Sequence, residues 1–183
     1  MPRAIPWLLI LLLAPASAGA DEKLWSLLKS GGQVVLIRHT ITTAGAGDPP
    51  GMRLDDCSTQ RNLTDAGREH ARRIGAEWRK RAIPLERLLS SPWCRCLETA
   101  RLAFQKEPEL WGALSNLFGY PQNSERQVRE MRALVSKHAA KGNLVLVTHG
   151  STISALTGIS PATGEMVVLS KGAVAGRLAV PEG

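Results

Sequence analysis

Two apolar runs in this sequence each end in a histidine, and these two histidines are the first candidates for chemistry. The run from 33 to 37 leads into Arg38 and His39, and the run from 143 to 148 leads into His149. If both runs are strands of one open α/β sheet, ligands bind beyond their carboxyl ends, where the two imidazoles would meet. An imidazole that can attack, next to a guanidinium group that can hold oxygen atoms, suits transfer of a phosphoryl group.

Another arginine lies where a predicted strand passes into a helix. The segment 90–100 contains Pro92, which favours the first turn of a helix, and Arg95 follows three residues later. Free backbone N–H groups at a helix N-terminus attract anions. We therefore expect Arg95 to face the same pocket as the two histidines.

Four motifs, in this order, resemble those of the histidine phosphatase superfamily, which has the phosphoglycerate mutase fold. The resemblance covers nearly the whole chain after residue 20. It implies a three-layer α/β/α sandwich with a mostly parallel central sheet. The motifs are Leu36-Ile37-Arg38-His39-Thr40, Arg61-Asn62-Leu63-Thr64 with Gly67, Ser90-Ser91 with Arg95 and Thr99-Ala100, and Thr148-His149-Gly150.

The resemblance also implies roles for single residues. His39 is the expected nucleophile, whose ring nitrogen takes the phosphoryl group and later yields it to water. Arg38, Arg95 and His149 are expected around the phosphate, and Arg61 joins them from the loop after the first strand. Positive neighbours should lower the pKa of His39, which keeps its ring neutral and nucleophilic. Neither a metal ion nor an organic cofactor is expected.

Two positions depart from the family pattern. Thr40 follows the nucleophile where many members have glycine, and Asn116 stands nearest to the mid-chain position where members acting on metabolites often carry a glutamate as proton donor. Protonation of the leaving group normally contributes about 100-fold to 10,000-fold to the rate. Either the substrate has a good leaving group, or another acid serves, for which the candidates are Asp48, Asp55 and Asp56.

The first twenty residues have the pattern of a secretory signal peptide. Arg3 precedes an apolar stretch from 7 to 13, and Ala18-Gly19-Ala20 fits a small-x-small cleavage site. A retained membrane anchor is the alternative, but the apolar stretch is short for a bilayer span. We expect residues 21–183 to form one histidine phosphatase domain, periplasmic or secreted, with no stable membrane insertion after cleavage.

The charge balance favours anionic partners. Without Arg3 the chain has 22 basic and 16 acidic residues, a net charge of about +6 with neutral histidines. Nucleic acid is not expected, because the sequence has no basic tract with interleaved aromatic residues. A phosphorylated small molecule or a phosphorylated envelope glycan is expected instead.

Three cysteines allow one intramolecular disulfide in an oxidising compartment. We expect Cys57 to pair with Cys94 or Cys96, which would fix the segment that holds Arg95. Zinc binding is the alternative. A structural zinc site usually needs four ligands, however, and the sequence has no Cys-x-x-Cys motif.

Strands alternating with helices indicate a layered α/β domain. We expect a helix around 24–28 that ends at Gly31-Gly32, a helix capped by Thr64, a strand over 85–90 and a helix capped by Ser124. A short helix over 151–156 and strands over 166–169 and 173–180 follow, whereas 104–123 shows no regular pattern.

Other residues receive more ordinary interpretations. The long stretch 41–62, with Arg53 and Arg61, is expected to form a wall of the pocket. His70 and His138 lie within predicted helices and are assigned to packing or to the surface. Glu98 is expected to pair with a nearby arginine such as Arg95 or Arg101.

Taken together, these patterns predict an exported phosphomonoesterase that works through a phosphohistidine at His39. A sugar phosphate of the cell envelope or of the lipopolysaccharide core is the expected substrate. One alternative is a protein phosphohistidine phosphatase, because a phosphoramidate needs less help to leave. The other is a non-catalytic module that binds phosphorylated glycans.

Overall fold

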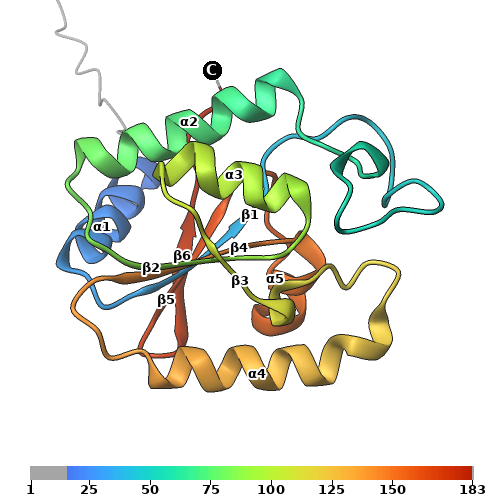
Figure 1. Ribbon diagram of the computed structural model, residues 1–183. Coiled ribbons are helices and arrows are strands. Elements are labelled where there is room, and N and C mark those ends of the chain that lie inside the picture. Colours follow the sequence, from blue (N-terminus) through green and yellow to red (C-terminus); the bar gives the residue numbers. More distant parts are fainter. Residues whose placement is uncertain (1–15, 183) are drawn as a thin grey trace, which may run out of the picture.

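The computed structural model describes residues 16–182, with side chains from residue 21, and has a six-stranded sheet at its centre (Figure 1). The order of the strands in the sheet is β3-β2-β4-β1-β5-β6. Their bounds are β1 Val34–Arg38, β2 Leu85–Ser90, β3 Glu109–Leu110, β4 Asn143–Thr148, β5 Met166–Ser170 and β6 Ala173–Leu178.

The two strands that precede the histidines lie side by side. β1 pairs with β4 in parallel, and Arg38 stands opposite Thr148. β2 and β3 extend this parallel arrangement, whereas β5 and β6 are antiparallel. His39 and His149 therefore leave the sheet at the same edge, and the predicted mostly parallel sheet is confirmed.

Helices cover both faces of the sheet, which makes the predicted three-layer sandwich (Figure 1). Three of them, α1 (Ala16–Ser30), α2 (Asp65–Lys80) and α3 (Cys94–Phe104), lie on one face, and α4 (Ser124–Lys137) and α5 (Gly150–Thr157) lie on the other. Along the central strands, successive side chains pack alternately against one helix layer and the other, as expected for a strand that is buried on both sides.

Each face of the sheet has its own apolar core. On the first face Val35 and Ile37 belong to one cluster with Trp78 of α2. On the second face Val34 and Leu36 belong to a separate cluster that includes Met131 of α4 and Ile153 of α5. This double burial explains why the two strand sequences are continuous apolar runs.

Short local signals set the ends of the helices that frame the site. The Thr64 hydroxyl caps α2 by accepting a hydrogen bond from the Gly67 N–H at 3.0 Å, as predicted. Gly31 follows the last residue of α1 with a φ of +74°, a conformation that favours glycine. Ser124 lies inside α4, and Asn123 takes the capping position that we predicted for Ser124.

Helices α2 and α3 approach each other closely at one glycine. A Cβ atom added to Gly75 would lie 1.8 Å from the carbonyl oxygen of Ala103, so the contact requires glycine. This contact fixes the last turn of α3 on α2, at the end of the helix opposite to Arg95.

Regular structure also occurs where the sequence shows no pattern. The segment 104–123 contains the edge strand β3 and two short 3-10 helices, Gly112–Leu114 and Pro121–Asn123. Elements of two or three residues are too short to produce a periodic pattern.

The predicted signal peptide falls mainly on residues 1–15, which lie outside the described residues. Helix α1 begins at Ala16, so the predicted cleavage point after Ala20 falls within it. Within residues 16–182, the structure has no helix whose length and apolar character would let it cross a membrane.

Candidate active site

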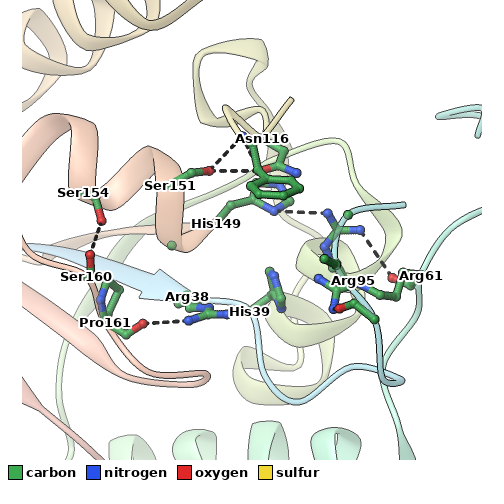
Figure 2. Close-up of a pocket in the computed structure, with 15 residues that line it drawn as sticks. Arg38, His39, Arg61, Arg95, Asn116, His149, Ser151, Ser154, Ser160 and Pro161 are labelled. Carbon is green, nitrogen blue, oxygen red and sulfur yellow. Dashed lines mark hydrogen bonds between the residues drawn. The ribbon is translucent and has the colours of Figure 1, made fainter. Parts of the chain in front are cut away.

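A cavity of about 400 Å³ opens at the carboxyl ends of β1 and β4 (Figure 2). His39 and His149 both line this cavity, and their ring centroids are 5.4 Å apart in an edge-to-face arrangement. The backbone holds them in register, because the His39 N–H donates to the Thr148 carbonyl oxygen at 2.9 Å. The structure thus brings together the two imidazoles that the sequence analysis expected to meet.

The hydrogen bond of His39 determines which ring nitrogen is free. Its Nδ1 lies 2.9 Å from the backbone oxygen of Thr40. A carbonyl oxygen can only accept, so Nδ1 carries the proton and Nε2 holds a lone pair. The lone pair of a neutral imidazole is the part of the ring that can act as a nucleophile.

The surroundings of His39 keep this ring uncharged. The side chain is almost fully buried, and burial lowers its pKa from about 6.5 to about 3. The hydrogen bond to Thr40 acts in the opposite direction, and the charges of Arg95, Arg38 and Arg61 lower the pKa further. The ring is therefore neutral, as predicted, but burial is the larger cause. The sequence analysis had expected the positive neighbours to be the cause.

Three guanidinium groups line the same cavity, from different segments of the chain. Arg38 comes from the end of β1, and its Nη1 donates to the Pro161 carbonyl oxygen at 2.8 Å. Arg61 comes from the long loop before α2, and its Nη1 donates to the Gly45 carbonyl oxygen at 2.7 Å. No carboxylate of residues 16–182 forms an ion pair with either of these two side chains.

These arginines also keep donors that the protein does not use. The Nε–H groups of Arg38, Arg61 and Arg95 are all buried without a hydrogen-bond partner among the described residues. A buried unsatisfied donor costs about 1–3 kcal/mol, and more when the group is charged. Three such arginines around one cavity favour the binding of an anion there.

Arg95 is the one arginine of the cavity with a carboxylate partner. Its side chain is only 1% exposed, and its two terminal nitrogens donate to the Asp48 carboxylate at 2.5 and 3.1 Å. The backbone N–H of Arg61 and the Nε1–H of Trp93 donate to the same carboxylate, each at 3.1 Å. Asp48 therefore fixes both Arg95 and the segment that carries Arg61.

Four donors also decide the charge of Asp48. Burial alone would raise its pKa, but the hydrogen bonds and the charge of Arg95 outweigh burial and hold the pKa below its usual value. The carboxylate stays ionised, so Asp48 has no proton to give at neutral pH. With this pair neutralised, the cavity keeps the two positive charges of Arg38 and Arg61.

His149 is held by both of its ring nitrogens. The Arg95 guanidinium lies 3.5 Å from Nδ1 and can only donate, so Nδ1 accepts and Nε2 carries the proton. The Nε2–H in turn donates to the Ser91 hydroxyl oxygen at 2.9 Å. Burial is the main cause that lowers the pKa of His149 well below its usual value, and the charges of the nearby arginines lower it further.

A disulfide ties the long loop to the helix that carries Arg95. Cys57 is bonded to Cys94, the first residue of α3. The sequence analysis left two partners open for Cys57, and Cys94 is the one that the structure shows. The Cys94 N–H also donates to the Gln60 side-chain oxygen at 3.0 Å. Gly45, Gly47 and Arg61 line the cavity, which confirms that this loop forms one of its walls.

Residues 34–118 match the family model described as histidine phosphatase superfamily (branch 1). The match begins at β1, includes His39 and Arg95, and ends just after Asn116. The histidine phosphatase superfamily is therefore the family that this part of the chain matches. No curated protein sequence matches it significantly.

Solved structures of phosphatases share the fold of this chain. A candidate α-ribazole-5'-phosphate phosphatase of Escherichia coli K-12 aligns with a TM-score of 0.63 at 17% identity, covering 82% of this chain and 97% of the other. The protein histidine phosphatase SixA complexed with tungstate aligns at 0.59 and 18%, covering 80% and 96%. The phosphoserine phosphatase of Entamoeba histolytica with 3-phosphoglyceric acid aligns at 0.61 and 14%, covering 82% and 98%. Identities this low establish the fold alone.

Some residues that the sequence analysis singled out lie away from the phosphatase cavity. Asp55 is largely exposed, and Asp56 binds Arg53 at 2.7 Å on the outer side of the loop. Neither acid lines the cavity, and Arg53 does not line it either.

Glu98 pairs with an arginine, as predicted, but with neither of the two that were named as examples. Glu98 binds Arg68 of α2 at 2.6 Å, because α2 and α3 lie side by side while Arg95 turns into the cavity. His70 is buried, with its Nε2 2.9 Å from the Val180 carbonyl oxygen, and the His138 Nε2 lies 3.1 Å from the Gly142 carbonyl oxygen. Both histidines therefore have structural contacts outside the cavity.

Several lining residues carried no recognised signal in the sequence. Ser151 and Ser154 face the cavity from α5, and Ser160, Pro161 and Phe118 complete this side. Ser151 and Ser154 are three residues apart, so they lie on one face of a helix. This spacing is a signal that the sequence contains. The contribution of Ser160 and Pro161 depends on the loop before β5, for which no local pattern existed.

We predict that the His39 ring of this phosphatase stays neutral between pH 8 and pH 4. Its folded-state pKa of about 3 means that protonation begins only below this range. Histidine-selective ¹⁵N NMR should show an Nδ1–H tautomer without a titration step, with the resonances assigned by their loss in His39→Gln. A midpoint near pH 6.5 would contradict the described environment.

We also predict that Asp48→Ala lowers kcat/KM for 4-nitrophenyl phosphate by about 10-fold to 100-fold, because Arg95 loses its fixed position. Asp55→Ala, which removes an exposed acid of the same loop, serves as the matched control and should leave the rate unchanged. An increase in rate for Asp48→Ala would show instead that its carboxylate competes with phosphate for Arg95.

Proposed function

We propose that this protein is an exported phosphatase that transfers a phosphoryl group to His39 and then to water. One observation carries the proposal: the unprotonated Nε2 of a neutral, buried His39 belongs to a cavity lined by three guanidinium groups. A nucleophile and an anion site in one cavity are the two parts that phosphoryl transfer requires.

In the first step the Nε2 lone pair attacks phosphorus. A nitrogen–phosphorus bond forms, and the bond from phosphorus to the leaving group breaks with its electron pair on the leaving atom. The Nδ1–H bond to Thr40 supports this step, because it helps to stabilise the positive charge that develops on the ring.

In the second step a water molecule attacks the phosphorus of the phosphohistidine. The nitrogen–phosphorus bond breaks, its electron pair returns to Nε2, and the proton of the water passes to the solvent. Inorganic phosphate leaves and the neutral His39 is restored.

The arginines stabilise the negative charge on the transferred group in both steps. Arg38 and Arg61 supply the uncompensated charge, and Arg95 supplies a guanidinium group whose orientation Asp48 fixes. His149 acts through its packing on the His39 ring and its contact with Arg95. A fixed array of charges needs no reorganisation at the moment of reaction.

Export is supported by two independent observations. The first twenty residues have the signal-peptide pattern, and the Cys57–Cys94 disulfide is typical of an oxidising compartment. After cleavage before Asp21, the chain keeps Leu24 and Leu28, which pack α1 onto the domain.

A sugar phosphate of the envelope is the first candidate substrate. The cavity is lined by serine side chains as well as by the arginines, and the exposed ring of Phe118 lines it too. Aromatic faces and hydroxyl groups are chemically suited to a sugar. A phosphohistidine or another phosphoramidate is the second candidate, favoured by Asn116 at the place where a proton-donating acid would be useful.

We predict that brief incubation with a ³²P-labelled aryl phosphate labels the wild-type protein with acid-labile, alkali-stable phosphate. His39→Gln should lose the label and lower kcat by about a thousandfold or more, because the nucleophile is gone. His138→Gln, a histidine outside the cavity, is the matched control and should keep both label and turnover. Tight phosphate binding by the wild type without label or hydrolysis would indicate a binding module instead.

For export, we predict that the full chain expressed in a Gram-negative host is recovered from the periplasm with a mass that begins at Asp21. The cause is cleavage after the small residues Ala18 and Ala20. Ala18→Gln should block processing. Recovery of uncleaved protein from the cytoplasm, with Cys57 reduced, would contradict the proposal.

A further inference from the structure

The phosphatase cavity has no acid that could protonate a leaving group. Among residues 16–182, no aspartate or glutamate lines it. Asp48 lies next to the cavity, but it is ionised and accepts four hydrogen bonds. The proton-donating glutamate that the family pattern has in the middle of the chain is therefore not replaced by another carboxylic acid in this cavity.

His149 does not supply the proton either. Its one N–H, on Nε2, is already donated to Ser91, and its Nδ1 lone pair faces Arg95. The proton on His39 is on Nδ1 and is donated to Thr40, away from the attacking nitrogen. Both imidazoles thus keep their protons in bonds to the protein.

Asn116 has an amide of fixed orientation in this cavity. The Phe118 N–H donates to Asn116 Oδ1 at 3.1 Å, which identifies that atom as the oxygen, and the Ser151 hydroxyl donates to it at 2.9 Å. Asn116 is 6% exposed, and its Nδ2 has no hydrogen-bond partner among the described residues. Figure 2 shows the Asn116 amide beside Ser151. Two donor protons of a buried side chain are therefore free for a ligand.

Asn116 also stands at the junction of two cavities. A second cavity of about 440 Å³ is lined by the loop 46–52 and by Tyr120, and it shares Ala46, Gly47, Asn116 and Phe118 with the first. A substrate whose phosphoryl group lies by His39 can extend its leaving group past Asn116 into this second space. Phe118 and Tyr120 are both exposed there.

We infer that Asn116 donates a hydrogen bond to the leaving atom, and that the natural substrate has a leaving group which departs without a proton from the protein. The inference rests on the proposed phosphatase function and narrows its substrate class. An amide stabilises developing negative charge but transfers no proton. Simple alkyl phosphates, whose leaving alkoxides are strongly basic, are then poor substrates.

Two kinds of phosphoryl compound meet this requirement. In a phosphoanhydride the leaving group is a phosphate, which is stable as an anion. In a phosphoramidate the nitrogen is already protonated to the ammonium form and departs as a neutral amine, and in a phosphohistidine the other ring nitrogen carries a proton, so the ring departs as a neutral imidazole. In either case the bond from phosphorus to the leaving atom breaks with its electron pair on that atom, and any later proton comes from water. An envelope sugar fits the first kind when its terminal phosphate is joined through a diphosphate.

The test is the dependence of kcat/KM on leaving-group basicity in wild-type protein. With a series of substituted phenyl phosphates, kcat/KM should fall by about tenfold for each unit by which the pKa of the phenol rises. A nearly flat dependence, with alkyl phosphates hydrolysed as fast as phenyl phosphates, would overturn the inference. The ³²P labelling of His39 is scored separately, so its failure would reject the phosphatase proposal instead.

Asn116→Ala tests the role of the amide. Removal of its hydrogen bond should lower kcat/KM most for the most basic phenols, which makes the dependence steeper, whereas a purely structural defect would lower all rates equally. Asn123→Ala, outside both cavities, is the matched control and should leave the series unchanged. Equal loss for every substrate would remove Asn116 from the leaving-group site.

Three further substrates distinguish the two kinds of phosphoryl compound. Phosphoramidate and a sugar diphosphate should both react much faster than a sugar monophosphate. The faster of the first two compounds indicates whether the natural substrate is a phosphoramidate or a phosphoanhydride. Faster hydrolysis of the sugar monophosphate would contradict the inference even if phosphohistidine forms.

Discussion

The parallel pairing of β1 with β4 is the constraint on which the site depends. Arg38 stands opposite Thr148, and the backbone bond from His39 to Thr148 continues this pairing one residue beyond the strands. Parallel strands in register end together, so two histidines that are far apart in sequence emerge side by side. A slip of one residue would move each side chain of one strand to the opposite face of the sheet, which would disrupt the packing of both cores and separate the imidazoles.

The electrostatic character of the cavity follows from what this edge of the sheet buries. Burial makes a charged imidazole costly, so His39 stays neutral, and the backbone oxygen of Thr40 decides which nitrogen is free. Arginine keeps its charge even when buried, and Asp48 compensates one guanidinium group of three. A neutral imidazole in a site of net positive charge is chemically suited to attack on a phosphoryl dianion. Among the residues that the structure describes, no aspartate or glutamate lines this cavity.

The long loop 41–62 shows how a segment without regular structure acquires a fixed position. The Cys57–Cys94 disulfide fastens it to α3, and Asp48 fastens it to Arg95 from the inside. Arg61 then reaches the cavity from a loop that its own hydrogen bond to Gly45 helps to close. The site is therefore as dependent on this loop as on the sheet.

The sheet, the helix layers and the two histidines could be predicted because each follows from a local pattern. Apolar runs predicted the strands, and Thr64 predicted the start of a helix. The positions of His39 and His149 at the ends of two strands predicted that both lie in the site. The role of Asp48 could not be predicted, because it depends on a loop conformation that brings residues 48 and 95 together. The partner of Glu98 could not be identified for the same reason: Arg68 lies on a neighbouring helix, and sequence spacing shows only neighbours on the same helix.

The most direct test of the central claim is a crystal structure of the oxidised protein with bound vanadate, which mimics a phosphoryl group during transfer. We expect vanadium at covalent distance from His39 Nε2, its oxygens in contact with Arg38 and Arg95, and the Nδ1–H bond to Thr40 intact. Vanadate bound elsewhere, or bonded to another nitrogen, would contradict the assignment of His39 as the nucleophile.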